Sequence, residues 1–352
     1  MEIVHFAQRD VRNRILRRWI LGWLTVWPRL LLNWSRIELL RREYTLLYGD
    51  KNFSDFPNVY NGHAPRVTIQ CTNMTTGLPC SFGRSGLMLY EEQAEGKGIK
   101  LEPDTELTLN SKLSVAHGVA ASSAFPPMFP PLEVGDSLID TMAKHPLLHL
   151  TDGGVFDNMG MDRPLWWYGQ NHQSPFDRIS TFLVVDAEGP FSTTIGKPWR
   201  YKFTLPRNMR ATAVLMKRNS TLNWQFLSKL RFTLIRIPVP ADSKPLSEPN
   251  LAEQIRTDLD RFSNLEVEEL VRNGYKAARA ALIQAHWLAD RLHDSEWCPV
   301  PSNGATPENR RKLLGKSRYR RWLPLFLGFQ DWAWWALLVI SIFVFYLYSL
   351  SQ

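Results

Sequence analysis

The stretch HLTDGGVFDNMG, residues 149–160, holds the residues of this chain that are best placed to do chemistry. Asp152 ends an apolar run, where α/β sheets hold their reactive groups, and Gly153 and Gly154 allow the backbone to approach a neighbouring element closely. A carboxylate in such a place can act as a general base when burial raises its proton affinity. Asp-Gly-Gly is also an ordinary turn sequence, so its chemistry depends on the segments around it.

The other reactive residue types are dispersed. His145 and His149 are four residues apart but have no acidic partner in their segment, which argues against a metal site. The three cysteines, Cys71, Cys80 and Cys298, form no CxxC pair. We therefore expect no metal ion, no cofactor and no disulfide framework, and a reducing compartment.

The net charge of +8 is concentrated in two blocks. Residues 9–18 carry five Arg and one Asp, and residues 310–321 carry seven basic residues and no acid, which leaves a slight excess of acid elsewhere. Each block adjoins an apolar, Trp-rich segment, which is how charge flanks membrane segments. We therefore expect a membrane partner and no nucleic acid.

Residues 332–350, WAWWALLVISIFVFYLYSL, contain no charged side chain. A helix of this length, with a rise of about 1.5 Å per residue, can cross roughly 30 Å of hydrocarbon. Its terminal Trp and Tyr residues are typical of aromatic belts, and the preceding basic block favours a cytoplasmic N-terminal side. The sequence therefore predicts a single-pass membrane protein whose soluble part lies on the cytoplasmic side.

A second apolar segment, residues 15–34, is broken by Arg17, Arg18, Pro28 and Arg29 and is too short to span a bilayer. One helical stripe of this segment is apolar and rich in tryptophan: Trp19, Trp23, Trp27, Leu30 and Trp34. Beside the Arg block, the stripe fits a helix in the membrane interface. An amphipathic helix packed on the domain fits equally well, and both interpretations stay open.

The body of the chain alternates strand and helix patterns. Residues 66–73 are short and β-branched, and residues 178–190 contain an apolar run typical of a parallel strand. Between them, residues 111–124 are predicted to be helical, with Asn110 or Ser111 as the N-cap. This alternation predicts an α/β domain with a mostly parallel sheet.

A last soluble helix is predicted at residues 264–292, where Ser263 and Glu266 make a capping-box pattern. The Pro, Ser, Asn and Gly residues of the following segment, 299–307, indicate a linker to the basic block.

Four segments follow the order and approximate spacing of bacterial patatin-like phospholipases, and the chain resembles that family over roughly residues 66–282. The segments are VAHGVAASSAFPPMFPPL (115–132), LTDGGVFDNMGM (150–161), FLVVDAEGP (182–190) and IRTDLDRFSNLEVEELVRNGY (255–275). The resemblance implies a patatin-like three-layer α/β domain and a lipid acyl hydrolase without cofactor. In that family, a serine in a Gly-x-Ser-x-Gly elbow attacks the acyl ester.

By the same resemblance, Asp152 is the base of a Ser-Asp dyad, and Gly153 and Gly154 are its motif glycines. Residues 120–124 are then a packing segment, with a hydroxyl nucleophile at Ser122 or Ser123 as the alternative.

The sequence departs from the family in two respects: no serine lies in Gly-x-Ser-x-Gly, and no Gly-Gly pair precedes Gly153 to form the oxyanion loop. The chain therefore resembles the C-terminal part of the domain. Three explanations follow: a truncated product, a split enzyme completed by an upstream half-domain chain, or a pseudoenzyme. A catalytically inactive membrane-bound scaffold is the function from a different class.

The sequence divides into four predicted parts. Residues 1–61 are the basic, Trp-rich N-terminal segment, with the interfacial helix as one interpretation, and residues 62–298 are the C-terminal part of the patatin-like domain. Residues 299–321 are a basic linker, and residues 322–352 are the transmembrane anchor. Membrane lipid is the expected substrate.

Overall fold

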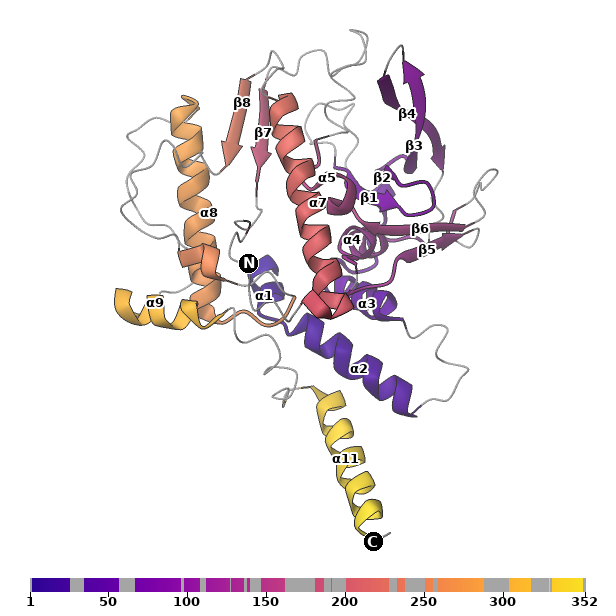
Figure 1. Cartoon of the computed structure of the whole chain (residues 1–352), viewed down its shortest axis with the longest axis vertical. Coiled ribbons are helices and arrows are strands. Elements are labelled where there is room, and N and C mark those ends of the chain that lie inside the picture. Colours follow the sequence, from indigo (N-terminus) through magenta and orange to yellow (C-terminus); the bar gives the residue numbers. More distant parts are fainter. Residues whose placement is uncertain are drawn as a thin grey trace. The chain divides into compact units, whose positions relative to one another are not determined.

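The fold is known from a computed structural model, in which the chain forms two compact units that are described separately. The first comprises Met1–Leu39, Leu183–Pro190 and Ile235–Gln352, and the second comprises Leu40–Phe182 and Phe191–Leu234. The elements are labelled in Figure 1. The structure describes residues 2–25, 35–56, 67–95, 98–107, 112–126, 128–135, 138–139, 147–161, 181–186, 191, 201–227, 233–237, 251–255, 259–287, 304–317, 329 and 331–350.

The second unit is built on a six-stranded sheet in the order β4-β3-β2-β1-β6-β5. Every strand of this sheet pairs antiparallel with its neighbours. The strands are β1 (Ile69–Asn73), β2 (Leu78–Phe82), β3 (Leu87–Glu95), β4 (Gly98–Leu107), β5 (Leu132–Gly135) and β6 (Leu147–Asp152).

The prediction of a mostly parallel sheet is wrong for this sheet. The first four strands follow one another through connections of two to four residues, such as the turn between Asn73 and Leu78, where Gly77 has a φ of +73°. Connections this short join only antiparallel strands, because a parallel pair needs a crossover of a dozen or more residues. The sequence analysis found β1 but not the hairpin strands that follow it.

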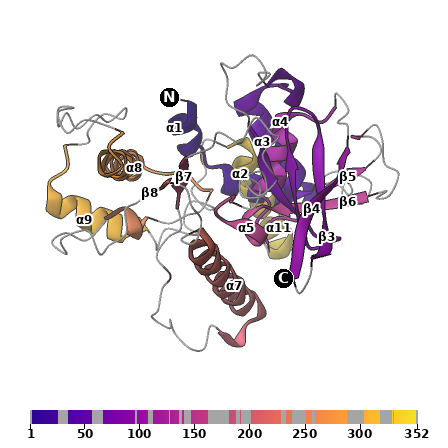
Figure 2. The same cartoon turned by 90° about the horizontal axis from the view of Figure 1, so that it is seen from above.

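Helix α4 (Val115–Ser122) packs against β1, β5 and β6, and Figure 2 shows it beside the sheet. Small residues permit this contact, since Ala120, Ala121 and Ala124 are fully buried. At Gly118 a Cβ atom would lie 2.6 Å from Cζ of Phe53, so no larger residue fits there without displacing that ring. The predicted helix is therefore confirmed, although it begins after Ser114 rather than after Asn110 or Ser111.

Two further helices belong to the second unit. The short helix α5 (Gly154–Asp157) directly follows β6 and contacts the long helix α7 (Thr204–Leu227). A two-stranded sheet pairs β7 (Thr181–Val185) with β8 (Thr233–Ile237), and these strands cross the boundary between the units. The predicted strand within residues 178–190 is thus confirmed as β7.

In the first unit, helix α8 (Asn264–Gln284) begins with the predicted capping box. The backbone N–H of Ser263 donates to Oε2 of Glu266 at 2.7 Å, and the N–H of Glu266 donates to Oγ of Ser263 at 3.3 Å. The helix ends at Gln284, earlier than the predicted residue 292. The capping box therefore located the start of α8, whereas the apolar pattern did not locate its end.

Helix α9 (Pro307–Gly315) lies within the predicted basic linker and packs on α8. Leu314 joins a core cluster with Ile255 and Leu265. The carboxylate of Glu268, which is fully buried, pairs with Arg310 and with Arg272. One of the seven basic residues of the block is therefore structural.

Helix α11 (Trp332–Leu350) has the predicted bounds. It is long and apolar enough to cross a membrane, and most of its large apolar side chains are exposed. This confirms the predicted helix. The side of the membrane on which the rest of the chain lies stays a prediction.

The short helix α1 (Glu2–Ala7) precedes α2 (Val11–Thr25), and α2 contacts α11. Val11 and Ile15 are buried, so the first half of α2 packs on the protein. Trp19 is half-buried, with the guanidinium of Arg36 5.3 Å from its ring centroid. The packed interpretation therefore holds for the start of the predicted segment. Residues 26–34 lie outside the described residues, and their interfacial placement stays a prediction.

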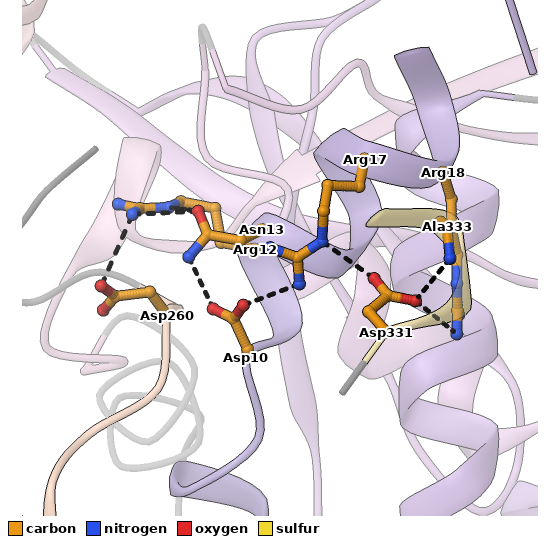
Figure 3. Close-up of polar contacts among 8 residues, drawn as sticks. All are labelled: Asp10, Arg12, Asn13, Arg17, Arg18, Asp260, Asp331 and Ala333. Atoms are coloured by element: carbon orange, nitrogen blue, oxygen red, sulfur yellow. Dashed lines mark hydrogen bonds and ion pairs between the residues drawn. The ribbon is translucent and has the colours of Figure 1, made fainter. Parts of the chain in front are cut away.

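Figure 3 shows an ion-pair network that joins α2 to the residue before α11. Arg17 donates from Nε to Asp331 at 3.0 Å and from Nη2 to Asp10 at 2.8 Å, and its side chain is only 2% exposed. Arg12 pairs with Asp260 at 3.5 Å. Asp331 also accepts from the backbone N–H of Ala333 and so caps α11. The network fixes the start of the apolar helix through buried charge.

Helix α3 (Arg36–Tyr48) is buried along one side. Leu40 and Tyr44 of this helix are buried, and they bring α3 to the site described next.

Candidate functional site

Asp152 is the last residue of β6, where the strand leaves the sheet. Its register partner on β1 is Cys71, and the hydroxyl of Thr72 donates to the backbone carbonyl of Asp152 at 2.9 Å. The backbone N–H of Asp152 donates to the carbonyl of Ala124 at 3.4 Å. The sheet and the end of α4 therefore fix the backbone of this residue.

The two glycines that follow Asp152 are required by close approaches. A Cβ atom at Gly153 would lie 2.6 Å from the carbonyl oxygen of Gln70, which belongs to the neighbouring strand β1. A Cβ atom at Gly154 would lie 3.0 Å from Oδ1 of Asp152 and 2.6 Å from Oδ1 of Asn158. Because glycine has no Cβ atom, the N–H of Gly154 can donate to Oδ1 of Asp152 at 2.7 Å. The Asp-Gly-Gly sequence thus orients the carboxylate.

The carboxylate of Asp152 is half-buried. Burial raises the pKa of Asp152 above its ordinary value, and the hydrogen bond from the N–H of Gly154 opposes this rise. One carboxylate oxygen is held by that bond. A carboxylate with raised proton affinity and fixed orientation is suited to accept a proton from a hydroxyl group.

Tyr44 reaches this region from α3 and was missed by the sequence analysis. Its hydroxyl donates to Oγ of Ser123 at 3.0 Å. Burial is the main cause that raises the pKa of Tyr44, and the nearby charge of Asp152 adds to the rise. Tyr44 therefore stays a neutral donor beside the carboxylate. No local motif announces it, because it lies in the N-terminal segment outside the resemblance.

The hydroxyl of Ser123 already has hydrogen-bond partners within the fold, as expected of a packing residue. It donates to the carbonyl of Val119 at 2.7 Å and accepts from Tyr44. Ser122 is half-buried on the same helix. The alternative of a nucleophile at Ser122 or Ser123 would require the hydroxyl of Ser123 to leave its helical partner.

The cysteines beside Asp152 are poor nucleophiles. Cys71 and Cys80 face each other across β1 and β2, and both are free thiols in the buried core. Burial raises the pKa of Cys71 well above its ordinary value. Since the thiolate is the reactive form, this thiol is a structural residue of the sheet.

The segment after Asp152 is fastened to α7 by two asparagines. Asn223 donates to Oδ1 of Asp157 at 3.0 Å, and Asn219 donates to the carbonyl of Phe156. Gly160, with a φ of +65°, then turns the chain. The predicted turn at residues 157–160 therefore serves to hold α5 against α7.

No group of three His, Cys, Asp or Glu side chains in the described parts of the chain could hold a metal ion. His149 lies 3.8 Å from Glu133 across β5 and β6, and both side chains are substantially exposed. His145 lies outside the described residues.

The raised pKa of Asp152 leads to a pH-dependent stability effect. A carboxyl whose folded pKa is raised contributes stability below its unfolded pKa of about 3.9, and that contribution is lost as the pH rises through the folded pKa. Asp152→Asn does not titrate but can still accept from Gly154. We therefore expect the melting temperature of Asp152→Asn, relative to the wild type, to rise as the pH increases from about 4 through the raised folded pKa of Asp152.

Thermal unfolding of the detergent-solubilised chain measures this difference, with Glu133→Gln as the control. The carboxyl of Glu133 is 68% exposed on the adjacent strand, so its replacement should change the melting temperature little. A difference for Asp152→Asn that does not change with pH would contradict the expectation.

A scan against protein-family models finds no match to the chain. The search of curated proteins also finds no significant match. The assignment of a function therefore depends on the geometry around Asp152 and on the sequence resemblance.

Proposed function

We propose that this chain is the base-bearing part of a membrane-anchored, patatin-like lipid acyl hydrolase. Asp152 would act as the base of a Ser-Asp dyad. The serine would come from residues other than these 352, because none of the serines here lies in a Gly-x-Ser-x-Gly elbow. The substrate class is a phospholipid or another acyl lipid.

The observation that carries the proposal is the arrangement of Asp152. Its carboxylate is half-buried at the end of β6, has a raised pKa, and is oriented by the N–H of Gly154. Gly153 permits β6 to turn directly against the carbonyl of Gln70. A base that works without histidine needs this combination of raised proton affinity and fixed geometry.

The membrane part of the proposal is supported by α11 and by its flanking charge. An apolar helix of 19 residues follows a segment with seven basic residues. The positive-inside rule then assigns the soluble part to the cytoplasmic side. An anchor beside the bilayer suits an enzyme whose substrate is a membrane lipid.

One observation favours a second function, a membrane-bound scaffold without catalytic activity. The hydroxyl of Ser123, which lies near the site, is bonded to Val119 and Tyr44 rather than to Asp152. In a scaffold, the site would be a remnant of the fold.

A fluorophosphonate probe separates the two functions, because it reacts covalently only with an activated serine. The purified chain would be tested alone and together with the polypeptide encoded directly upstream. We expect labelling of a serine in the added polypeptide, dependent on Asp152 and unaffected by Glu133→Gln. Labelling of Ser123 in the chain alone would place the nucleophile here. No labelling in either sample would favour the scaffold.

A further inference from the structure

Helix α7 has two different sides, and its inner side belongs to the site. Asn219 and Asn223 hold α5, which begins two residues after Asp152. Ser220 and Leu227 lie on the same side and are buried. The inner side of α7 is therefore buried and bonded to α5.

The outer side of α7 exposes large aliphatic residues. Val214, Leu215 and Leu222 are 48%, 67% and 48% exposed. Together with Arg207 and Arg218, these three residues lie on one side of a helix with 3.6 residues per turn. We call these five residues the outer face of α7. It mixes apolar and cationic side chains.

The charge of α7 has one sign. The helix carries Arg207, Arg210, Lys217 and Arg218, and its sequence from Thr204 to Leu227 contains no Asp or Glu. Both arginines of the outer face are exposed. Phe203, just before the helix, is 58% exposed and extends the apolar surface.

These properties identify the occupant by its chemistry. Water alone does not favour three large exposed aliphatic residues in one patch, whereas a bilayer interface takes up apolar side chains and its anionic headgroups attract cations. The same chain carries the apolar helix α11, so a bilayer is already its expected neighbour. A protein partner would have to supply both an apolar patch and an excess of acid.

We propose that the outer face of α7 lies in the interfacial region of an anionic lipid bilayer. This inference deepens the proposed function, on which it rests for its biological meaning. Because α5 joins the inner side of α7 to Asp152, the lipid-bound helix would hold the base close to the layer in which acyl esters lie.

A nitroxide at position 215 tests the proposal in the full chain. Leu215→Cys would be labelled with Cys298 replaced by serine, since Cys71 and Cys80 are buried. The protein would be reconstituted in phosphatidylcholine vesicles with and without about 30 mol% phosphatidylserine. We expect phosphatidylserine to reduce collisions with a water-soluble nickel chelate at least about threefold and to increase collisions with oxygen.

Two double variants test whether the arginines cause this change in the collision rates of the nitroxide. Removing two interfacial cations, Arg207→Gln with Arg218→Gln, should weaken partitioning of the helix about 30-fold and restore collisions with nickel. The matched control, Lys51→Gln with Lys276→Gln, removes the same charge from exposed lysines elsewhere and should keep the shift.

Two outcomes would overturn the proposal. The nitroxide could remain open to nickel in phosphatidylserine vesicles. Alternatively, it could be protected equally in phosphatidylcholine or in detergent at rising protein concentration, which would indicate a protein on the outer face. Neither outcome affects the probe labelling that tests the dyad, so the two proposals fail separately.

Discussion

Asp152→Asn is expected to lower the rate of ester hydrolysis by the complete enzyme about 10²–10⁴-fold, the range for loss of a general base. Asparagine keeps the shape of the side chain and can still accept the N–H of Gly154, which now lies 2.7 Å from Oδ1. It cannot take a proton from the attacking hydroxyl. The loss should therefore appear in kcat, with little change in KM.

The measurement is hydrolysis of a micellar phospholipid by the chain with its upstream polypeptide, followed by titration of the fatty acid released. Glu133→Gln, an exposed carboxylate on the neighbouring strand, is the matched control and should retain full activity. The rate of the wild type should also rise with pH through the raised pKa of Asp152, because only the carboxylate is a base. A variant at Asp152 with wild-type kcat would refute the assignment of the base.

Asp331→Ala is expected to give the largest loss of stability, about 3 kcal/mol, because it removes the carboxylate that accepts from Nε of the buried Arg17 guanidinium at 3.0 Å. It also removes the cap of α11 at Ala333. For a unit of this size, the melting temperature should fall by about 10 °C. Asp50→Ala, at an exposed position, should change it little.

A double variant distinguishes buried charge from loss of packing. Arg17→Met with Asp331→Asn removes both charges of this pair and keeps a side-chain acceptor for the N–H of Ala333, and replacing both partners of a buried ion pair is often neutral or stabilising. We expect the double variant to recover most of the stability that Asp331→Ala loses, as measured by thermal unfolding in detergent. A double variant as unstable as the single one would mean that the hydrogen-bond geometry of the network matters more than its charge balance.

Local signals in the sequence were sufficient for several elements. The capping box of Ser263 and Glu266 located the start of α8, and the absence of charge from residue 332 to residue 350 located α11. Both signals act within one helix and need no tertiary partner. The end of α8 was overestimated because the apolar pattern continues past Gln284, where the helix stops.

The sheet was less predictable because strand pairing is not local. The chain pairs β1 with β2 through a tight turn and with β6 across about eighty residues, as Thr72 and Asp152 show. Reading β1, α4 and β7 as an alternation suggested a parallel sheet, since the strands between β1 and α4 went unrecognised.

The candidate site was predictable only where its residues are adjacent in the sequence. Asp152, Gly153 and Gly154 are adjacent in sequence, and the structure places them in one turn. Tyr44 comes from a helix about one hundred residues earlier and is recognisable only once α3 and α4 are in contact through its bond to Ser123.

The anchoring of α11 at Asp331 has a consequence for the thickness of membrane that suits this protein. Nineteen residues at about 1.5 Å each give a length of about 28 Å, close to the hydrocarbon thickness of a thin bilayer and shorter than that of a sterol-rich one. A helix shorter than the hydrocarbon layer leaves a mismatch that local thinning of the bilayer or snorkelling of flanking side chains must take up. Here the start of the helix is held by Arg17. If α11 spans a bilayer, a thicker bilayer has to thin around the held start of the helix, so a thin membrane would suit this chain best.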